Sequence, residues 1–211
     1  MVRPLDVATQ GAVRDRSRVI VRDFILCTVR TLDTDEPVTF GFTTFGEDVT
    51  TNIIDGETGS TVSHTFYGDR APIQEMDPIP FKIGIEIDTV QVKLNHLHPV
   101  VQLMVRGHNC RNAKVQIHRG HLDPDSMLLV AAPRCRRLGQ INGTPIITPA
   151  VGGQGSVTLK VVSHTRELTR TNPAKSSDET YRLRSGDRIN QYAGTAGQWP
   201  IFWGEVRGTA D

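Results

Sequence analysis

Residues 81–95 read FKIGIEIDTVQVKLN, and this stretch predicts a β fold. Apolar side chains occupy every second position from Phe81 to Ile87, which is the pattern of a half-buried strand. After Asp88 and Thr89 the alternation resumes one position out of phase, at Val90. Because side chains on a strand alternate between faces, a slip of one residue would turn the strand inside out unless a bulge absorbs it. We therefore expect a bulge or a tight bend at Asp88-Thr89.

Similar patterns predict further strands along the chain. They cover residues 19–29, 38–42, 100–105, 113–118, 127–130, 138–142 and 156–163. Turn-forming residues separate them, notably at 55–59, 77–80 and 151–155. Only residues 177–192 suggest a helix, with Ser177 or Asp178 as its N-cap and Gly186 as its end.

Many short strands without long helices are typical of barrels or a sandwich. We predict a mainly β fold with little helix, built as two small β-barrel domains. The sharpest boundary is the proline-rich segment 72–80. It divides the chain into an N-terminal arm (1–17), a first β-barrel region (18–80) and a second β-barrel region (81–211), and the two barrels can share strands.

The charge of the chain is balanced overall but uneven along its length. Its 211 residues carry a formal charge of +1, which argues against a simple nucleic-acid binder. Residues 31–90 hold twelve acids against Arg70 and Lys82, whereas residues 91–211 hold sixteen bases against eight acids. Two solvated faces can differ in this way by chance. The sharper interpretation is self-association, in which the acidic half of one subunit faces the basic half of the next.

The cysteines and the apolar runs of the sequence indicate the compartment in which the protein is made. Cys27, Cys110 and Cys135 are an odd number with no close pair, so they indicate buried thiols rather than a disulfide framework. The first nineteen residues lack the apolar core of a signal peptide, and no run approaches the roughly 20 apolar residues of a membrane span. We expect no membrane insertion.

Histidines cluster in the middle of the chain and offer the best case for a metal site. On a strand, His96 and His98 would share a face and could bind one zinc ion, with a cysteine thiolate beside them. Against this, Pro99 follows His98 directly and turn signals surround the other histidines. We expect no metal. The full set considered is His96, His98, His108, Cys110, His118 and His121.

A Cys/His hydrolase would need a cysteine at a helix N-terminus or beside a positive group, with a histidine in reach. Cys27 lies in an apolar strand, and Cys135 lies in a Pro-Arg-Cys-Arg-Arg segment that we interpret as a loop with a solvated thiol. Asp123-Pro124-Asp125 lacks the further ligands of a calcium loop, and residues 152–155 suit a hairpin tip better than a phosphate loop. We therefore predict a non-enzyme with no catalytic residue and no cofactor.

Five segments in order resemble the tail-tip (baseplate) hub proteins of long-tailed bacteriophages and gene transfer agents. The most specific features are HRGHLD at 118–123, LGQI at 138–141, and Ser185-Gly186-Asp187 followed by Trp203-Gly204. The resemblance runs from about residue 18 to residue 207. The segments are FGEDVTTNIIDGETGSTVSHTFYGDRAPI, PIPFKIGIEIDTVQVKLNHLHPVVQLMVRG, VQIHRGHLD, LGQINGTPI and YRLRSGDRINQYAGTAGQWPIFWGE.

This resemblance implies a structural protein of the virion tail, assembled in the cytoplasm of the host bacterium. Such hubs form a homotrimer that adapts the sixfold tail tube to the threefold tip, each subunit supplying two tube-like β-barrels. The implied partners are the distal tail protein, the central fibre or tip proteins, and genomic DNA passing through the lumen without specific binding. In a cyclic ring every contact is head-to-tail, so an acidic surface can meet a different, basic one. Some of the acids would instead line the lumen.

One departure from the family concerns cysteine. Some hub relatives carry a C-terminal iron–sulfur module, which normally needs four thiolates. This chain has three scattered cysteines, so that property is not carried over. The alternative function is a tail-associated cell-wall hydrolase with a Cys/His or zinc-dependent site.

The aromatic run Trp199-Pro200-Ile201-Phe202-Trp203 contains both tryptophans of the chain. Because aromatic side chains of this size are rarely left exposed without a partner, we expect Trp203 to be buried against the second barrel. The alternative is that the run docks the next tail protein.

Overall fold

The computed structural model describes residues 6–14, 19–80, 86–151, 153, 155–169, 171 and 175–197. The chain divides into two compact units, Met1–Leu168 and Thr169–Asp211. The first unit contains α1 (Val7–Arg14), β1 (Ile20–Thr31), β2 (Pro37–Thr43), β3 (Val49–Ile54), β4 (Thr61–Phe66), β5 (Ile73–Met76), β6 (Thr89–Asn95), α2 (Pro99–Gly107), β7 (His108–Leu122), β8 (Arg134–Gly143), β9 (Ile146–Ile147), β10 (Ser156–Ser163) and all but the last residue of the 3-10 helix η1 (His164–Thr169). Among the described residues, no helix is long and apolar enough to cross a membrane.

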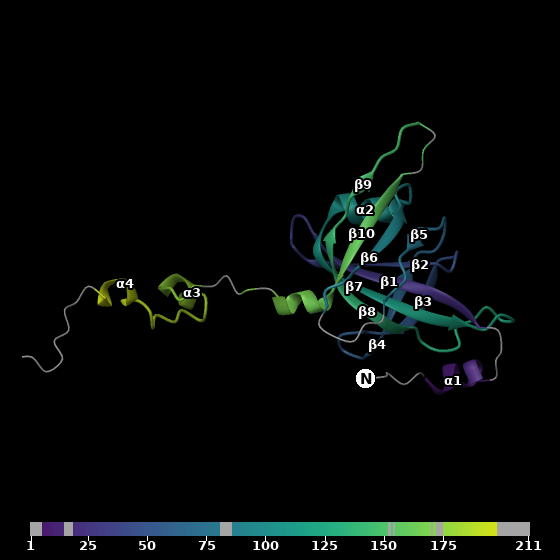
Figure 1. Cartoon of the computed structure of the whole chain (residues 1–211), viewed down its shortest axis with the longest axis horizontal. Helices are drawn as coiled ribbons and strands as arrows, with labels where there is room; N and C mark the ends of the chain where they lie inside the picture. The colour runs from purple at the N-terminus through teal and green to yellow at the C-terminus, as the bar shows by residue number, and fades with distance from the viewer. Residues whose placement is uncertain are drawn as a thin grey trace, which may run out of the picture. The chain divides into compact units, whose positions relative to one another are not determined.

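The strands of the first unit form one ten-stranded sheet. Its main order is β2-β1-β7-β8-β10-β6-β5, and neighbours along this path are antiparallel. Off this path, β3 pairs with β4 and touches β8, while β9 pairs with β10. The sheet curls into a half-barrel (Figure 1). The prediction of a mainly β fold with little helix is confirmed.

Strands from both sides of residue 80 belong to this one sheet. In its centre β1 pairs with β7 along almost its whole length, with a bulge between Thr28 and Arg30. Strand β5 likewise pairs with β6 across the proline-rich segment. Strands from the two regions predicted from the sequence therefore pair within one sheet, and the division into two barrel domains stays a prediction.

The sheet is buried on both faces at β1, because alternate residues of this strand enter two different clusters. Ile25, Cys27 and Val29 face the larger cluster, to which β6, β7, β10 and α2 contribute. Phe24 and Leu26 face a smaller cluster under the β3–β4 hairpin. There the rings of Phe24 and Phe66 meet edge to face, with centroids 5.2 Å apart. Burial on two faces explains why β1 is apolar without alternation.

Two of the predicted strands are wrong. Residues 100–105 lie in α2, where Pro99 stands at the first turn and Val101 and Met104 are buried against the sheet. A short apolar run fits a buried strand and a buried helix equally, and here a spacing of three residues matches one helix face. Residues 127–130 form a turn and a single bridge, Leu122 to Leu129, with Met127 at a φ of 56°.

The stretch 81–95 is described only in part. Residues 81–85 lie outside the described residues, residues 86–88 form no strand, and β6 begins at Thr89. Within β6 the alternation is as predicted, because Val90, Val92 and Leu94 are fully buried.

The second unit contains α3 (Asp178–Arg182) and α4 (Ala193–Ala196). The Ser177 hydroxyl accepts a hydrogen bond from the Thr180 N–H, so the predicted N-cap is confirmed. Gly186 adopts a φ of 76°, and its N–H donates to the Arg182 carbonyl. Helix α3 itself ends at Arg182, and the turn that follows it ends at Gly186, where a positive φ is cheap for glycine.

Candidate functional site

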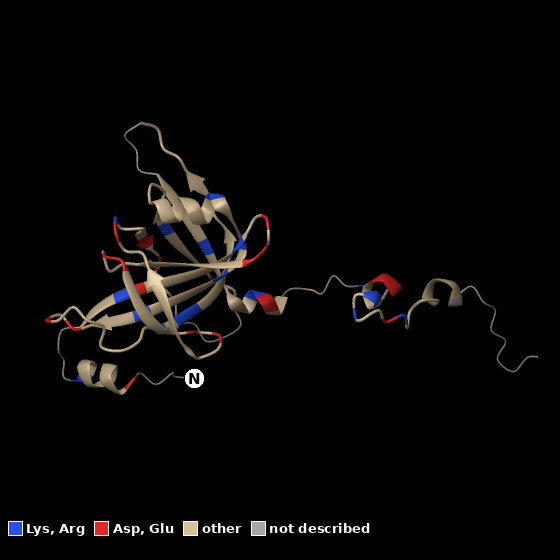
Figure 2. Cartoon of the chain, turned by 180° about the vertical axis from the view of Figure 1, so that it is seen from behind, with Lys and Arg blue, Asp and Glu red and all other residues tan. Residues whose placement is uncertain are grey.

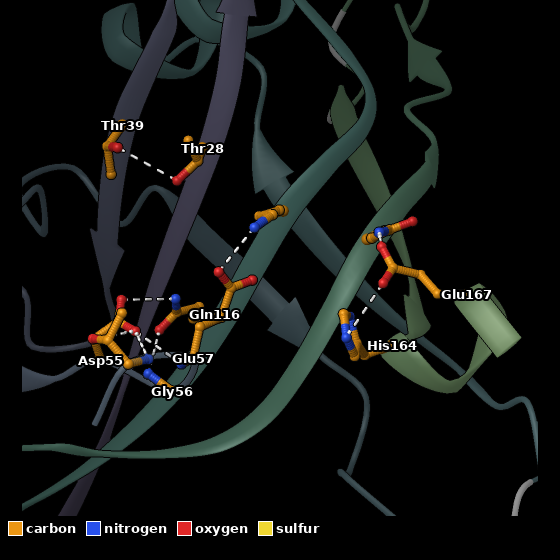
Figure 3. Close-up of polar contacts among 11 residues, drawn as sticks. Thr28, Thr39, Asp55, Gly56, Glu57, Gln116, His164 and Glu167 are labelled. Atoms are coloured by element: carbon orange, nitrogen blue, oxygen red, sulfur yellow. Dashed lines mark hydrogen bonds and ion pairs between the residues drawn. The ribbon is translucent and has the colours of Figure 1, made fainter. Parts of the chain in front are cut away.

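A cluster of hydrogen-bonded polar side chains joins β7 to the turn of the β3–β4 hairpin (Figure 3). Lys114, Gln116 and His118 alternate along β7 and therefore point to one face of the sheet. Each of the three side chains hydrogen-bonds a different residue between Ile54 and Glu57. His118 Nε2 donates to the Ile54 carbonyl (3.0 Å), Gln116 Nε2 donates to Asp55 Oδ2 (3.1 Å), and Lys114 Nζ donates to Glu57 Oε2 (2.8 Å). This ladder, Lys114-Gln116-His118, holds the hairpin over the smaller core cluster.

Asp55 organises the turn itself. One of its carboxylate oxygens accepts hydrogen bonds from the Glu57 and Thr58 N–H groups, each at 2.8 Å, and from the Thr58 hydroxyl. Burial on its own would raise the pKa of Asp55, but these bonds and the one from Gln116 outweigh it and lower the pKa to about 2. The carboxylate is therefore ionised throughout the neutral range and stabilises the turn.

His118 is fully buried beside this turn. Desolvation disfavours the imidazolium and lowers the pKa of His118 to about 4, against a weaker opposing effect of the bond to Ile54. The side chain is neutral at pH 7, with its proton on Nε2 because that nitrogen donates to the carbonyl. Its Nδ1 is buried and has no hydrogen-bond partner among the described residues.

Cys135 lies directly across from His118 in the pairing of β7 with β8. The expectation of a solvated loop thiol is wrong, because Cys135 is in a strand and buried. Its Sγ donates to the Arg137 carbonyl at 3.3 Å, whereas His118 donates to Ile54. Neither of these bonds joins the thiol to the imidazole, as a nucleophile and its base would require.

The space next to this thiol is small. A cavity of about 220 Å³ is lined by residues of the hairpin turn, by Arg134 and by Cys135. This lies below the roughly 300 to 1,000 Å³ of typical ligand pockets. A Cβ added at Gly56 would come within 2.6 Å of Cys135 Sγ. The turn therefore packs closely on the thiol.

The other candidate ligands are dispersed over several elements. His96 lies in a turn, His98 immediately precedes α2, and His108 and Cys110 begin β7. Burial raises the pKa of Cys110 to about 11, and it lowers the pKa of His121, which Arg136 and Arg119 lower further. Cys27 is fully buried, and burial raises its pKa as well. Among the described residues no three histidine, cysteine or acidic side chains are grouped to hold a metal ion.

A second anchor is the nearly buried ion pair of Arg137 and Asp88. Arg137 Nη1 and Nη2 each donate to one carboxylate oxygen at 2.9 Å, and Nη2 also donates to the Asp88 carbonyl at 3.0 Å. The same carbonyl accepts the Ser163 N–H. Asp88 thus joins the start of β6 to β8 and to the end of β10.

The 3-10 helix η1 follows β10 and is held to the sheet by side chains. Glu167 accepts a hydrogen bond from Gln140 and pairs with His164 at 3.4 Å (Figure 3). Gln140 is buried on β8. The hydrogen bond between Gln140 and Glu167 therefore joins η1, the last element of the first unit, to strand β8 of the sheet.

The charge asymmetry of the sequence is partly used within the chain. Acids of the segment 31–90 pair with bases of the segment 91–211 in Glu75–Lys93, Glu57–Lys114 and Asp88–Arg137. Figure 2 shows acidic residues mainly at loops and strand ends, with several basic residues within the strands. Folding therefore explains part of the acidic and basic blocks without a second subunit.

The ladder was not predicted from the sequence, although the sequence carries one signal for it. On β7 the polar residues Gln116 and His118 alternate with the apolar residues Val115 and Ile117, and all four are buried.

Neither the protein-family models nor the curated proteins give a match to this chain.

Proposed function

We propose that this chain is a structural hub subunit of a siphophage-like tail tip or baseplate. Three copies form a ring that adapts the sixfold tail tube to the threefold tip and encloses the DNA channel. The observation that supports this most directly is the mainly β sheet curled into a half-barrel, since a tube-like barrel is what the resemblance implies. The subunit acts by shape and contact rather than by chemistry.

The segments that carry the resemblance coincide with elements that organise this sheet. HRGHLD contains His118 of the ladder and the end of β7, and LGQI lies in the middle of β8. FGEDVTTNIIDGETGSTVSHTF spans the β3–β4 hairpin with the Asp55 turn. Two of the three most specific features, HRGHLD and LGQI, thus fall on residues that maintain the fold, which favours a structural role.

Copy number in the assembled tail tests this proposal. Native mass spectrometry of tail tips that contain the chain should give three copies, with the distal tail protein and the central tip proteins bound. Raised salt should loosen the isolated trimer, because partly exposed charge pairs are screened over roughly 8 to 10 Å at ordinary ionic strength. A stable sixfold ring of this chain would contradict the threefold adaptor.

A peptidoglycan zymogram separates this role from that of a cell-wall hydrolase. The purified chain should leave no cleared band, and Cys135→Ser should behave as the parent chain does. Clearing that disappears in Cys135→Ser or in His118→Gln would replace the structural role with an enzymatic one. Zinc bound in a 1:1 ratio and lost in His96→Ala/His98→Ala would do the same.

A further inference from the structure

The connection between β8 and β10 is an uncharged arm. We define the arm as the described residues 144–151, 153 and 155, which include β9 and extend beyond the rest of the sheet (Figure 1). From Leu138 to Leu159 the sequence contains no aspartate, glutamate, lysine or arginine, although these types make up 22% of the chain. Three apolar side chains of the arm face solvent, because Ile146, Ile147 and Val151 are 41%, 56% and 107% exposed. Exposed apolar side chains that gather in one place often mark an interaction site.

The base of the arm is fixed in place. Ile146 and Ile147 pair with Val157 and Ser156 of β10, and the Thr158 N–H donates to the Pro145 carbonyl at 3.0 Å. Gly155 packs directly on the His96 ring. A side chain at position 155 would place its Cβ 2.3 Å from an atom of that ring. The arm is therefore presented by the sheet in a defined direction.

An apolar groove lies at the opposite end of the same strands. Its volume is about 350 Å³, and the connection between β7 and β8 provides most of its lining together with Ala12 of α1. Leu128 in this lining is 69% exposed. Asp123 stands at the rim, where hydrogen bonds from Ser126 and from the Asp125 N–H lower its pKa. The apolar lining residues are Val19, Leu122, Pro124, Leu128, Leu129 and Val130.

Geometry prevents the arm from reaching the groove of its own chain. The groove precedes β8 and the arm follows it, so the ten residues of β8 separate them by roughly 30 Å. The charges at the two places are complementary. Near the arm, Ile146 pairs with Val157 of β10, and the exposed Lys160 lies three residues further along that strand. At the groove, Asp123 and the exposed Asp125 flank the apolar lining.

We propose that the arm of one copy of this chain docks in the groove of a second copy. Ile147 and Val151 cover the apolar lining, and Lys160 approaches Asp123 and Asp125 at the rim. The contact joins two different surfaces, so its repetition produces a closed ring or an open filament. This inference rests on the proposed function, for which it supplies the head-to-tail contact between subunits.

Site-specific photo-cross-linking of the full chain tests the contact. A benzophenone amino acid at Val151 should, on irradiation, link to residues 122–130 of a second copy, identified by mass spectrometry of mixed ¹⁴N and ¹⁵N chains. The control carries the same amino acid at Ile189, which is 77% exposed in the second unit. Links only within one chain, or links to another part of the second copy, would overturn the inference.

Charge and apolarity are tested by association measurements in sedimentation velocity. Ile147→Asp and Leu128→Asp should each weaken self-association by about tenfold or more, as loss of a central apolar contact does. Leu183→Asp, a matched change at an 88% exposed leucine of the second unit, should leave it unchanged. Lys160→Glu should weaken association, and Asp125→Lys should partly restore it.

The failure of this inference is distinguishable from failure of the proposed function. A parent chain that stays monomeric at every concentration, or arm variants that associate normally, would overturn the arm contact. Tail tips that still hold three copies would then leave the hub role intact. A copy number other than three would remove the hub role, even if the arm cross-links to the groove.

Discussion

At the scale of single residues, His118 and Asp55 give the protein two separate pH dependences. The folded pKa of His118, about 4, lies below its ordinary value of 6.5. The unfolded chain therefore binds a proton at His118 between pH 6.5 and pH 4, and the folded chain does not, so stability falls as the pH falls through this range. The folded pKa of Asp55, about 2, lies below 3.8, so its stabilisation is lost only between pH 3.8 and 2.

The His118 contribution is measurable by urea unfolding at pH 7, 5.5 and 4.5. We expect the parent chain to lose about 3 kcal/mol between pH 6.5 and 4 through this residue. In His118→Gln an amide can still donate to the Ile54 carbonyl but does not titrate, so the loss with falling pH should be smaller. Equal slopes in the two chains would refute the assignment.

The buried pair of Arg137 and Asp88 belongs to the same scale. Asp88→Ala leaves the nearly buried guanidinium without its carboxylate, which should destabilise the chain by about 3 to 5 kcal/mol. Replacing both residues, Asp88→Leu with Arg137→Met, should cost less than Asp88→Ala alone. The exposed pair is the control, because Glu75→Ala should leave the urea midpoint unchanged. A double variant that is less stable than Asp88→Ala would contradict this account.

At the scale of elements, Gly41 sets how closely β2 approaches the β3–β4 hairpin. A Cβ at this position would lie 2.4 Å from the Thr65 carbonyl oxygen, which belongs to the backbone and cannot rotate away. Gly41→Ala should therefore destabilise the chain by about 1 to 3 kcal/mol, the usual cost of overpacking. Gly143→Ala is the matched control, because nothing lies within 4 Å of an added Cβ there.

Thermal unfolding of the two alanine variants makes this comparison directly. The melting temperature of Gly41→Ala should fall, and that of Gly143→Ala should remain close to the parent value. If the two variants melt together, the contact between Gly41 and Thr65 does not restrict the hairpin.

The elements also show how far the sequence could predict the fold. Strands with a clear signal, such as β1, β6 and β10, were predicted within a few residues. The β3–β4 hairpin was missed, because half of its strand residues are threonine, serine or asparagine and only Ile53 and Phe66 are fully buried. Helix α2 was misread because it is only nine residues long and begins with the β-branched residues Val100 and Val101 after Pro99. Sequence periodicity reports burial, and burial alone does not distinguish these cases.

The ladder could not be predicted for a different reason. Gln116 and His118 are polar, and their burial depends on which segment covers β7. That segment is the turn 54–57, about 60 positions earlier in the chain, and nothing local in the sequence links the two. The cysteines illustrate the same point, since Cys135 is surrounded by arginines in sequence but faces the hairpin in the structure.

At the scale of the whole molecule, the first unit contains both core clusters. Their residues lie between Phe24 and Val161, and none of the described residues of the second unit belongs to them. A chain ending at Leu168 should therefore unfold cooperatively in urea and keep the far-ultraviolet circular dichroism of β structure. A gradual transition without a plateau would show that residues after 168 are needed for folding.

The aromatic run at 199–203 lies outside the described residues, and its burial stays a prediction. If Trp203 is buried, Trp203→Ala should destabilise the full chain by about 3 to 5 kcal/mol and lower its melting temperature. If the run docks another tail protein, the melting temperature should be unchanged and only tail assembly should fail. Calorimetry of the purified chain distinguishes these two outcomes.

The central pairing of β1 with β7 also affects the order of events during synthesis. Asp23 and Arg119, which form an ion pair across these strands, are 96 positions apart. At typical translation rates β1 leaves the ribosome roughly 5 to 20 s before its partner. Through that interval β1 lacks β7, which is one of its two hydrogen-bonded neighbours in the sheet. We therefore expect slow folding, set by the closure of this long loop, and a nascent chain that depends on chaperones until β7 emerges.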